Sequence, residues 1–284
     1  MNNETRCVRA GCASRWCAAL LMVASCAAHA APFTAYIDQF RIMRNDGVFF
    51  VDNFSDGVPP PSALPDERVY GVQGSFDGGE SGGKLRIGGD GYTTSANALG
   101  QPRRLNSATL QTNNNSADTT NGLKKNFAFE VLGWFDYVAP GPGDSYGIRL
   151  TDGGQNDVVE LRVAWSSTLD TPVVRFFRQD FVLDTLTLLE EVALPAAYLG
   201  PIGLGLLHVS PGDDVISAAF CLGGPETCAD DEEVEFLAAT TTIFHGELWT
   251  RADFRATTTV PEPAALGLPA IGLAGLGVLR RRKS

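Results

Sequence analysis

Residues 127–137 read FAFEVLGWFDY, and residues 158–165 read VVELRVAW. In both stretches apolar side chains return at every second position, which is the period of a strand with one face in a core. Glu160 and Arg162 project from the opposite face of the second stretch. The two stretches therefore predict half-buried antiparallel strands, and they favour an all-β fold.

Similar short apolar runs recur along the rest of the chain, each bounded by Pro, Gly, Asn or Asp, and no long amphipathic helix interrupts them. Asn45-Asp46-Gly47 is a strong hairpin signal between two of these runs. We predict a single antiparallel β-sandwich of jelly-roll type over residues 31–255. The other expected strands are 34–42, 48–53, 69–76, 84–87, 107–112, 146–151, 173–178, 185–192, 202–209, 215–222, 233–237 and 244–249.

The order of strands, loops and glycine-rich turns over residues 48–222 resembles the concanavalin A-like lectin and glucanase superfamily. This resemblance rests on architecture and not on a motif. It implies a sandwich that binds or cleaves carbohydrate, in many members with a structural Ca²⁺.

The N-terminus has the layout of a secretory signal peptide. Three arginines precede an apolar stretch at residues 17–28, and Ala28-His29-Ala30 fits a cleavage site of the A-x-A type, with Ala28 and Ala30 as its small residues. We therefore expect residues 1–30 to be removed on export. The alternative is an N-terminal membrane anchor, which the short apolar stretch disfavours.

The C-terminus has three parts in order: Pro261-Glu262-Pro263, sixteen uncharged residues at 264–279, and the basic cluster Arg280-Arg281-Arg282-Lys283. As a helix the uncharged run spans about 24 Å, somewhat less than a bilayer core. The basic cluster acts as a stop-transfer signal that stays cytoplasmic. Pro261 and Pro263 hold Glu262 in an extended, exposed conformation. The pattern predicts an apolar membrane helix preceded by a processing site.

This tail resembles the PEP-CTERM sorting signal of Gram-negative bacteria, on Pro261, Glu262, Pro263, the glycine-rich apolar run and the basic cluster. The resemblance implies processing by exosortase, an inner-membrane intermediate, and a final place at the cell surface or in an exopolysaccharide or biofilm matrix. The alternative is an ordinary membrane anchor. The expected division is a signal peptide at 1–30, the sandwich at 31–255, and a spacer with the sorting segment at 256–284.

Charge and cysteine content describe the part between the two signals. The leader contains three arginines and Glu4, and the tail contains four basic residues and Glu262. Without them the chain has 15 basic and 31 acidic residues. A body near −16 argues against nucleic acid as a partner. Cys221 and Cys228 are the two cysteines outside the leader, and in an exported protein they predict one disulfide.

The run Asp231-Glu232-Glu233-Val234-Glu235 is the strongest pattern for catalysis. On a strand Asp231, Glu233 and Glu235 would share a face about 6.6 Å apart, and paired carboxylates at such distances divide the acid and nucleophile roles in glycoside hydrolysis. Glucanases of the resembled superfamily use Glu-x-Asp-x-Glu, whereas the order here is Asp-x-Glu-x-Glu. The alternative is a solvated acidic edge beside the cysteine pair.

Two further groups are candidates for binding. Asp152, Asn156 and Asp157 lie in one turn and offer the oxygen ligands that Ca²⁺ prefers, although Asp, Asn and Gly are also ordinary turn residues. Trp134 shares a strand face with Glu130 and Asp136, so its ring could stack on a sugar beside polar groups. The alternative for Trp134 is core packing.

These patterns lead to one expectation and one alternative for function. We expect an exported, exosortase-processed protein of the surface or matrix that acts as a non-catalytic carbohydrate-binding or structural module. Its expected partners are exosortase, extracellular polysaccharide and, before processing, the membrane. The alternative is a glycan hydrolase or lyase of the concanavalin A-like sandwich class.

Overall fold

The stretch 127–137 forms β8 (Phe129–Asp136), which pairs on both sides within a seven-stranded antiparallel sheet. The structure, a computed structural model, describes residues 33–45, 47–60, 69–76, 79–96, 102–111, 123–124, 127–152, 157–180, 183, 185–213, 215–229, 234–242 and 248–259. Within these residues the chain is all β apart from two short 3-10 turns, Gly89–Gly91 and Thr227–Ala229. No helix among them is both long and apolar enough to span a membrane.

The seven-stranded sheet has the order β15-β14-β13-β8-β1-β2, with β4 also paired to β1. The hairpin expected around residue 46 is confirmed, because Arg44 and Gly47 pair across it. Besides β8, its strands are β1 (Thr34–Arg44), β2 (Gly47–Asp52), β4 (Leu85–Gly88), β13 (Pro201–His208), β14 (Val215–Cys221) and β15 (Val234–Thr242).

The nine-stranded sheet has the order β12-β11-β10-β9-β16-β6-β3, with β5 paired to β6 and β7 paired to β16. Every pairing in both sheets is antiparallel in the described residues. Its strands are β3 (Val69–Gln73), β5 (Thr93–Ala96), β6 (Pro102–Gln111), β7 (Leu123–Lys124), β9 (Asp144–Asp152), β10 (Asp157–Ser166), β11 (Thr171–Asp180), β12 (Thr185–Ala193) and β16 (Leu248–Thr259).

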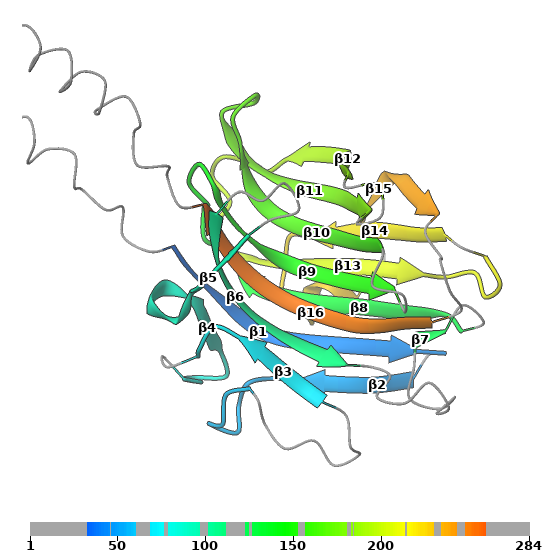
Figure 1. Cartoon of the computed structure of the whole chain (residues 1–284), viewed down its shortest axis with the longest axis horizontal. Helices are drawn as coiled ribbons and strands as arrows, with labels where there is room; N and C mark the ends of the chain where they lie inside the picture. The colour runs from blue at the N-terminus through cyan, green and yellow to red at the C-terminus, as the bar shows by residue number, and fades with distance from the viewer. Residues whose placement is uncertain are drawn as a thin grey trace, which may run out of the picture. The chain divides into compact units, whose positions relative to one another are not determined.

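The two sheets form the layers of a sandwich, and Figure 1 shows β9, β10 and β16 of one layer running alongside β13, β8 and β1 of the other. Aromatic side chains join the layers across the core. The ring of Phe40 on β1 lies 5.3 Å from that of Phe254 on β16, and the rings of Phe135 and Tyr146 are equally close. The predicted all-β class and the two antiparallel sheets are thus confirmed.

Strand β16 is the main correction to the sequence prediction. The expected final strand was 244–249, and residues 256–259 were assigned to a spacer, yet β16 runs to Thr259 with partners on both sides. The small side chains of Ala252 and Ala256, alternating with charged residues, gave little apolar signal. They are fully buried because β16 lies in the middle of the sheet. The predicted apolar helix at 264–279 lies outside the described residues.

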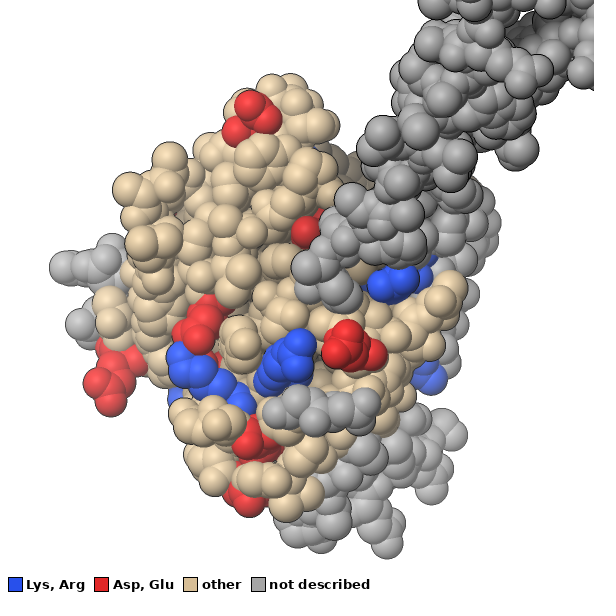
Figure 2. All heavy atoms as spheres, turned by 90° about the vertical axis from the view of Figure 1, so that its left-hand side faces the viewer, with Lys and Arg blue, Asp and Glu red and all other residues tan. Residues whose placement is uncertain are grey.

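Surface charges of both signs are interleaved on the side of the molecule in Figure 2. In its lower half, basic and acidic side chains lie next to one another, and its upper half is mostly uncharged. Such surface pairs are screened by solvent and contribute little to stability. This side therefore offers no large field of one sign.

Candidate functional site

The outer face of the nine-stranded sheet, turned away from the core, carries buried polar side chains. Directly opposite residues on antiparallel strands share a face, so the register assembles this surface row by row. The first row reads Thr109, Asp253, Arg149, Glu160 and Phe177. The second row reads Ser107, Arg255, Gly147, Arg162 and Arg175. The third row reads Leu105, Thr257, Ser145, Ala164 and Val173.

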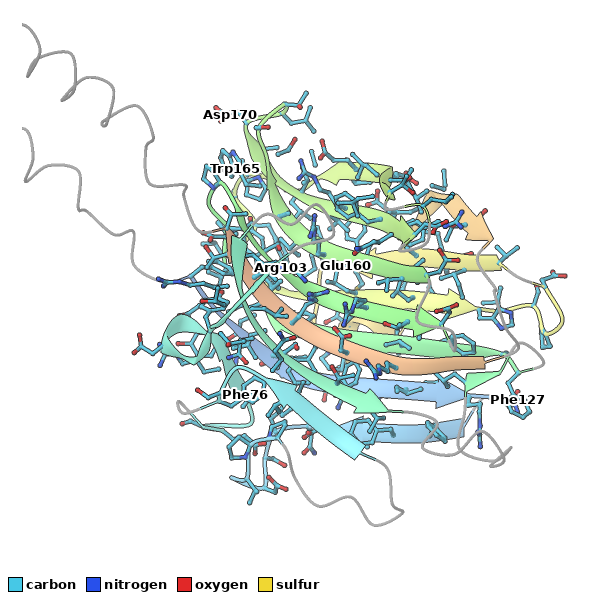
Figure 3. All side chains as sticks on the ribbon, in the orientation of Figure 1. Phe76, Arg103, Phe127, Glu160, Trp165 and Asp170 are labelled. Carbon is cyan, nitrogen blue, oxygen red and sulfur yellow. A yellow bond between two sulfur atoms is a disulfide. The ribbon has the colours of Figure 1, made fainter. Side chains whose placement is uncertain are left out.

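A groove with a cavity of about 180 Å³ lies on this face. Figure 3 labels Arg103, Glu160 and Trp165, which line it. We call it the arginine groove and define it by Arg103, Asp144, Glu160, Arg162, Trp165, Arg175, Gln179, Leu186 and residues 257–259. Its residues come from β6, β9, β10, β11, β12 and β16, so the groove exists only in the folded sheet.

Two ion pairs fix the flanks of this surface. Arg149 donates from Nε and Nη2 to Oδ2 of the fully buried Asp253, at 2.7 and 2.6 Å. On the other flank Arg175 Nε donates to Glu191 Oε2 at 2.5 Å, and Ser166 Oγ donates to the second oxygen of Glu191 at 2.9 Å. Charge-assisted hydrogen bonds of this kind hold side chains in a single geometry. The flanks are therefore preorganised.

The centre of the groove is different, because its charges are close but not hydrogen-bonded. Glu160 lies between Arg162 and Arg255, each 3.6 Å away by its Nη1 atom. That distance allows Coulomb attraction but is too long for a hydrogen bond. Among the described residues, Nε of Arg103, Nε of Arg162, and Nε and Nη2 of Arg255 are buried without a hydrogen-bond partner. Arg255 lies beside the groove and is not one of its lining residues.

Gly147 explains how Arg255 on β16 reaches Glu160 on β10. It occupies the position on β9 between Arg255 and Arg162 in the second row. A Cβ at this position would lie 2.2 Å from the carbonyl oxygen of Leu161 and 2.6 Å from Cα of Arg162. Glycine thus allows β9 and β10 to approach closely and leaves the space above β9 to the two arginines.

The pKa values follow from this crowding. Burial raises the pKa of Glu160, but the charges of Arg255, Arg162, Arg149 and Arg103 outweigh burial and hold the pKa at about 2. Burial, together with Arg149, lowers the pKa of Arg255 to about 9. Burial also lowers the pKa of Arg103. At neutral pH Glu160 is therefore a carboxylate and Arg255 is a cation, so the centre carries more positive than negative charge.

Apolar side chains flank these charges. The guanidinium carbon of Arg162 lies 4.2 Å from the ring centre of Phe177, which is a cation–π distance. Trp165 is partly buried and lines the groove together with Leu186. A surface that combines aromatic rings with convergent polar groups has the composition of a ligand site.

The predicted calcium residues come together only in part. Asp152 and Asp157 are fully buried near the ends of β9 and β10, and the Asp157 N–H donates to Asp152 Oδ1 at 3.2 Å. Arg178 approaches Asp157 at 3.4 Å and Asp180 at 3.6 Å, so an internal cation already lies among these carboxylates. Asn156 lies outside the described residues, among which no group of three acidic, His or Cys residues is arranged for a metal ion. The calcium site stays a prediction.

The predicted sugar-stacking residues lie on the other sheet. Trp134 is 5% exposed, beneath the guanidinium of Arg41 at 5.1 Å. Asp136 accepts two hydrogen bonds from Lys84 Nζ, at 2.5 and 2.7 Å. Glu130 is on the same outer face of β8 and is half-buried. None of the three lines the arginine groove, and their role in binding stays a prediction.

The remaining predicted residues divide between those described and those outside the description. Cys221 and Cys228 form the predicted disulfide. Glu235 is exposed near the start of the edge strand β15. The following lie outside the described residues: Asp231, Glu233, the cleavage residues Ala28 and Ala30, Pro261, Glu262, Pro263, and the basic cluster Arg280, Arg281, Arg282 and Lys283.

The comparisons with known proteins bear on the tail. The family model for the PEP-CTERM protein-sorting motif matches residues 259–283. No curated protein matches the chain. The motif is the recognition signal of exosortase, so it supports this enzyme as a partner, export of the protein, and a membrane-anchored intermediate before processing. The match begins at Thr259, the last residue of β16, so the signal directly follows a strand in the middle of the sheet.

Sequence reasoning did not find the arginine groove. It placed Glu160 and Arg162 on the non-core face of a strand, which was the available signal. Arg149 and Arg255 lie on strands whose neighbours in space are far apart in sequence. Their convergence depends on strand register, which alternation alone does not give.

Proposed function

We propose that this protein is an exported, exosortase-processed, non-catalytic carbohydrate-binding module of the cell surface or extracellular matrix, and that its arginine groove holds the polysaccharide. The observation that carries the proposal is the groove itself. Six strands bring polar side chains, most of them partly buried, and the ring of Trp165 to one cavity, although the outer face of a sheet is usually solvated and needs no such construction.

The arrangement of the sheets supports a concanavalin A-like type for the sandwich. The N-terminal strand β1 and the C-terminal strand β16 each lie inside a different sheet, and β8 and β9 are successive strands that belong to opposite sheets. We infer from this order, and from the curved strands of the nine-stranded sheet in Figure 1, a jelly-roll scaffold that presents one broad sheet face to a polymer.

The state of the carboxylates supports a binding role over a catalytic one. Glycoside hydrolysis by two carboxyl groups needs one of them to be protonated near neutral pH. Glu160, with a pKa of about 2, stays ionised, and Asp253 accepts two hydrogen bonds from Arg149. Glu160 is therefore unsuited to donate a proton to a leaving group.

One observation favours the enzyme alternative. Asp144 lines the groove, and burial raises its pKa against the hydrogen bonds from Thr258 and the Gly141 N–H. If the protein cleaves a glycan, Asp144→Asn should abolish cleavage and leave the melting temperature within a few degrees of the wild type. A variant with Gln at both Glu233 and Glu235, the catalytic candidates from the sequence, is compared with Asp144→Asn in the same cleavage assay.

Binding is tested with the full-length protein in detergent on an array of neutral and acidic bacterial and plant polysaccharides. We expect at least one polymer to bind. We expect Arg103→Gln with Arg162→Gln to weaken that binding about tenfold or more, because hydrogen bonds from charged groups are lost. Arg251→Gln is the matched control, since Arg251 is on the same face of β16 but does not line the groove. Absence of binding to every polymer, or binding that the double variant retains, would refute the proposal.

The sorting part is tested in cells with and without exosortase. A tag in the sandwich follows the wild type and a variant with alanine at residues 261–263. Wild-type protein should become smaller and leave the membrane fraction only when exosortase is present, and the variant should remain anchored. If the wild-type protein stays at full length in the presence of exosortase, the sorting proposal is refuted and the tail is an ordinary membrane anchor.

A further inference from the structure

Buried N–H groups of arginine without acceptors point to the chemistry of the ligand. The side chain of Arg255 is 3% exposed, yet its Nε and Nη2 have no hydrogen-bond partner in the part of the chain that the structure describes. The same is true of Nε of Arg103 and Nε of Arg162. An unpaired buried donor on a charged group is costly, because it loses water and gains no acceptor. All three arginines act on the same carboxylate, Glu160.

The charge balance of this surface is opposite to that of the protein. The five arginines Arg103, Arg149, Arg162, Arg175 and Arg255 lie near four carboxylates of the described residues, those of Glu160, Glu191, Asp253 and Asp144. Asp253 and Glu191 are already hydrogen-bonded to Arg149 and Arg175. The remaining three arginines therefore have Glu160 and Asp144 as their nearest carboxylates, in a mature body whose net charge is near −16.

An oxyanion with two acceptor oxygens fits the unmet donors better than water or a neutral hydroxyl does. The guanidinium group presents N–H donors in a fixed fork that matches a carboxylate or a sulfate. A neutral hydroxyl can accept a hydrogen bond but leaves the excess positive charge in place. Phe177 beside Arg162, with Trp165 and Leu186, adds apolar surface suited to the C–H face of a sugar ring.

We propose that the arginine groove selects an acidic polysaccharide, and that Arg103 and Arg162, which line it, hold an oxyanion group, a carboxylate or sulfate, on one of its sugar residues. The buried Arg255 does not line the groove and adds positive charge beside Glu160. This inference rests on the proposed carbohydrate-binding function and specifies its ligand class. A nucleic acid also carries oxyanions, but the strongly acidic body repels a long polyanion with closely spaced charges. An acidic polysaccharide has a lower charge density than duplex DNA, which carries one charge per about 1.7 Å of its axis, so the acidic body repels it less and it can present a single oxyanion to the groove.

The experiment compares polymers that differ only in charge, with the full-length protein in detergent at 0.15 M salt. The probes are polygalacturonate and its carboxyl-reduced neutral form, and dextran sulfate and neutral dextran. We expect an acidic polymer to bind about tenfold or more tightly than its neutral parent. Arg162→Gln should remove most of that preference, and Arg162→Lys should restore it only in part, because lysine lacks the fork. Arg251→Gln, an arginine of the same sheet face outside the groove, should keep the full preference.

The two polymer pairs separate the sources of the oxyanion, and the controls separate the two proposals. A preference within the polygalacturonate pair assigns a carboxylate, and one within the dextran pair assigns a sulfate. Equal binding of acidic and neutral forms overturns the inference and leaves carbohydrate binding intact, whereas absence of binding to all four polymers and to the wider array overturns both. If Arg162→Gln fails to fold, galacturonate and inorganic sulfate are titrated into the wild type. The inference is also overturned if neither ligand raises the melting temperature of the wild type more than an equal concentration of chloride does.

Discussion

Replacing Glu160 with Gln should destabilise the protein and remove a pH dependence. Glu160 has an ordinary pKa of 4.5 when unfolded and one of about 2 when folded. At about 1.4 kcal/mol per pH unit, this difference corresponds to about 3 kcal/mol of stability at neutral pH. Breaking a buried charge pair by removing one partner costs a similar amount. The side chain is 12% exposed, so screening by solvent reduces this value only modestly.

The sign of the pH effect follows from the direction of the shift. Because folding lowers the pKa of Glu160, its stabilisation is fully present above about pH 4.5 and is lost as pH falls toward about 2. Urea unfolding of wild type and Glu160→Gln at pH 7, 5, 4 and 3 measures this. The gap between the two proteins should be about 3 kcal/mol at pH 7 and should shrink steadily below pH 4.5.

The control is Glu235→Gln, which changes an exposed carboxylate on an edge strand and should alter stability by less than about 0.5 kcal/mol at every pH. A gap for Glu160→Gln that is small at pH 7, or that stays constant from pH 7 to pH 3, would falsify the electrostatic account of the groove. Glu160 would then be a solvated residue, and groups other than Glu160 would balance the positive charge of the neighbouring arginines.

Three further predictions concern stability. Replacing both Cys221 and Cys228 with Ala opens a loop of sequence separation 7 and should lower the free energy of unfolding by about 2 kcal/mol, measured by urea unfolding against the wild type under non-reducing conditions. Gly147→Ala should lower the free energy of unfolding by about 1–3 kcal/mol in the same assay, because the added Cβ would meet the backbone of β10. A variant as stable as the wild type would mean that β9 and β10 can move apart at little cost. Arg255→Leu should cost less stability than Glu160→Gln, because Glu160 keeps Arg162, Arg149 and Arg103 as charge partners, and it should weaken affinity for the acidic polymer. A loss of stability as large as that of Glu160→Gln, with unchanged affinity, would identify Arg255 as a structural residue.

The alternating stretches predicted the fold class well because each has one apolar and one polar face. In β8 and β10 the side chains of Val131, Phe135, Leu161 and Val163 are buried in the core as the pattern requires. Strand β16 escaped prediction for the opposite reason. Both of its faces are buried, one with small alanines and one with charged residues, so its sequence resembles that of a solvated linker.

The arginine groove could not be predicted for reasons of distance and register. Its arginines lie on β6, β9, β10, β11 and β16, which span most of the sandwich in sequence. A shift of one residue in any of these pairings would turn the charged face into the core. The pattern in residues 158–165 placed Glu160 and Arg162 on one face, but only the pairing of β16 with β9 brings Arg255 to them.

The unmet hydrogen bonds at the centre of the groove connect stability with function. A buried guanidinium N–H that lacks an acceptor lowers the stability of the ligand-free protein. A ligand that supplies the missing acceptors recovers the lost free energy only when it is bound, so the same feature that weakens the free protein strengthens binding. This coupling predicts that an acidic sugar raises the melting temperature of the wild type and has a much smaller effect on Arg162→Gln. A merely structural arginine would give the reverse pattern, a variant that is less stable and a wild type that is indifferent to the sugar.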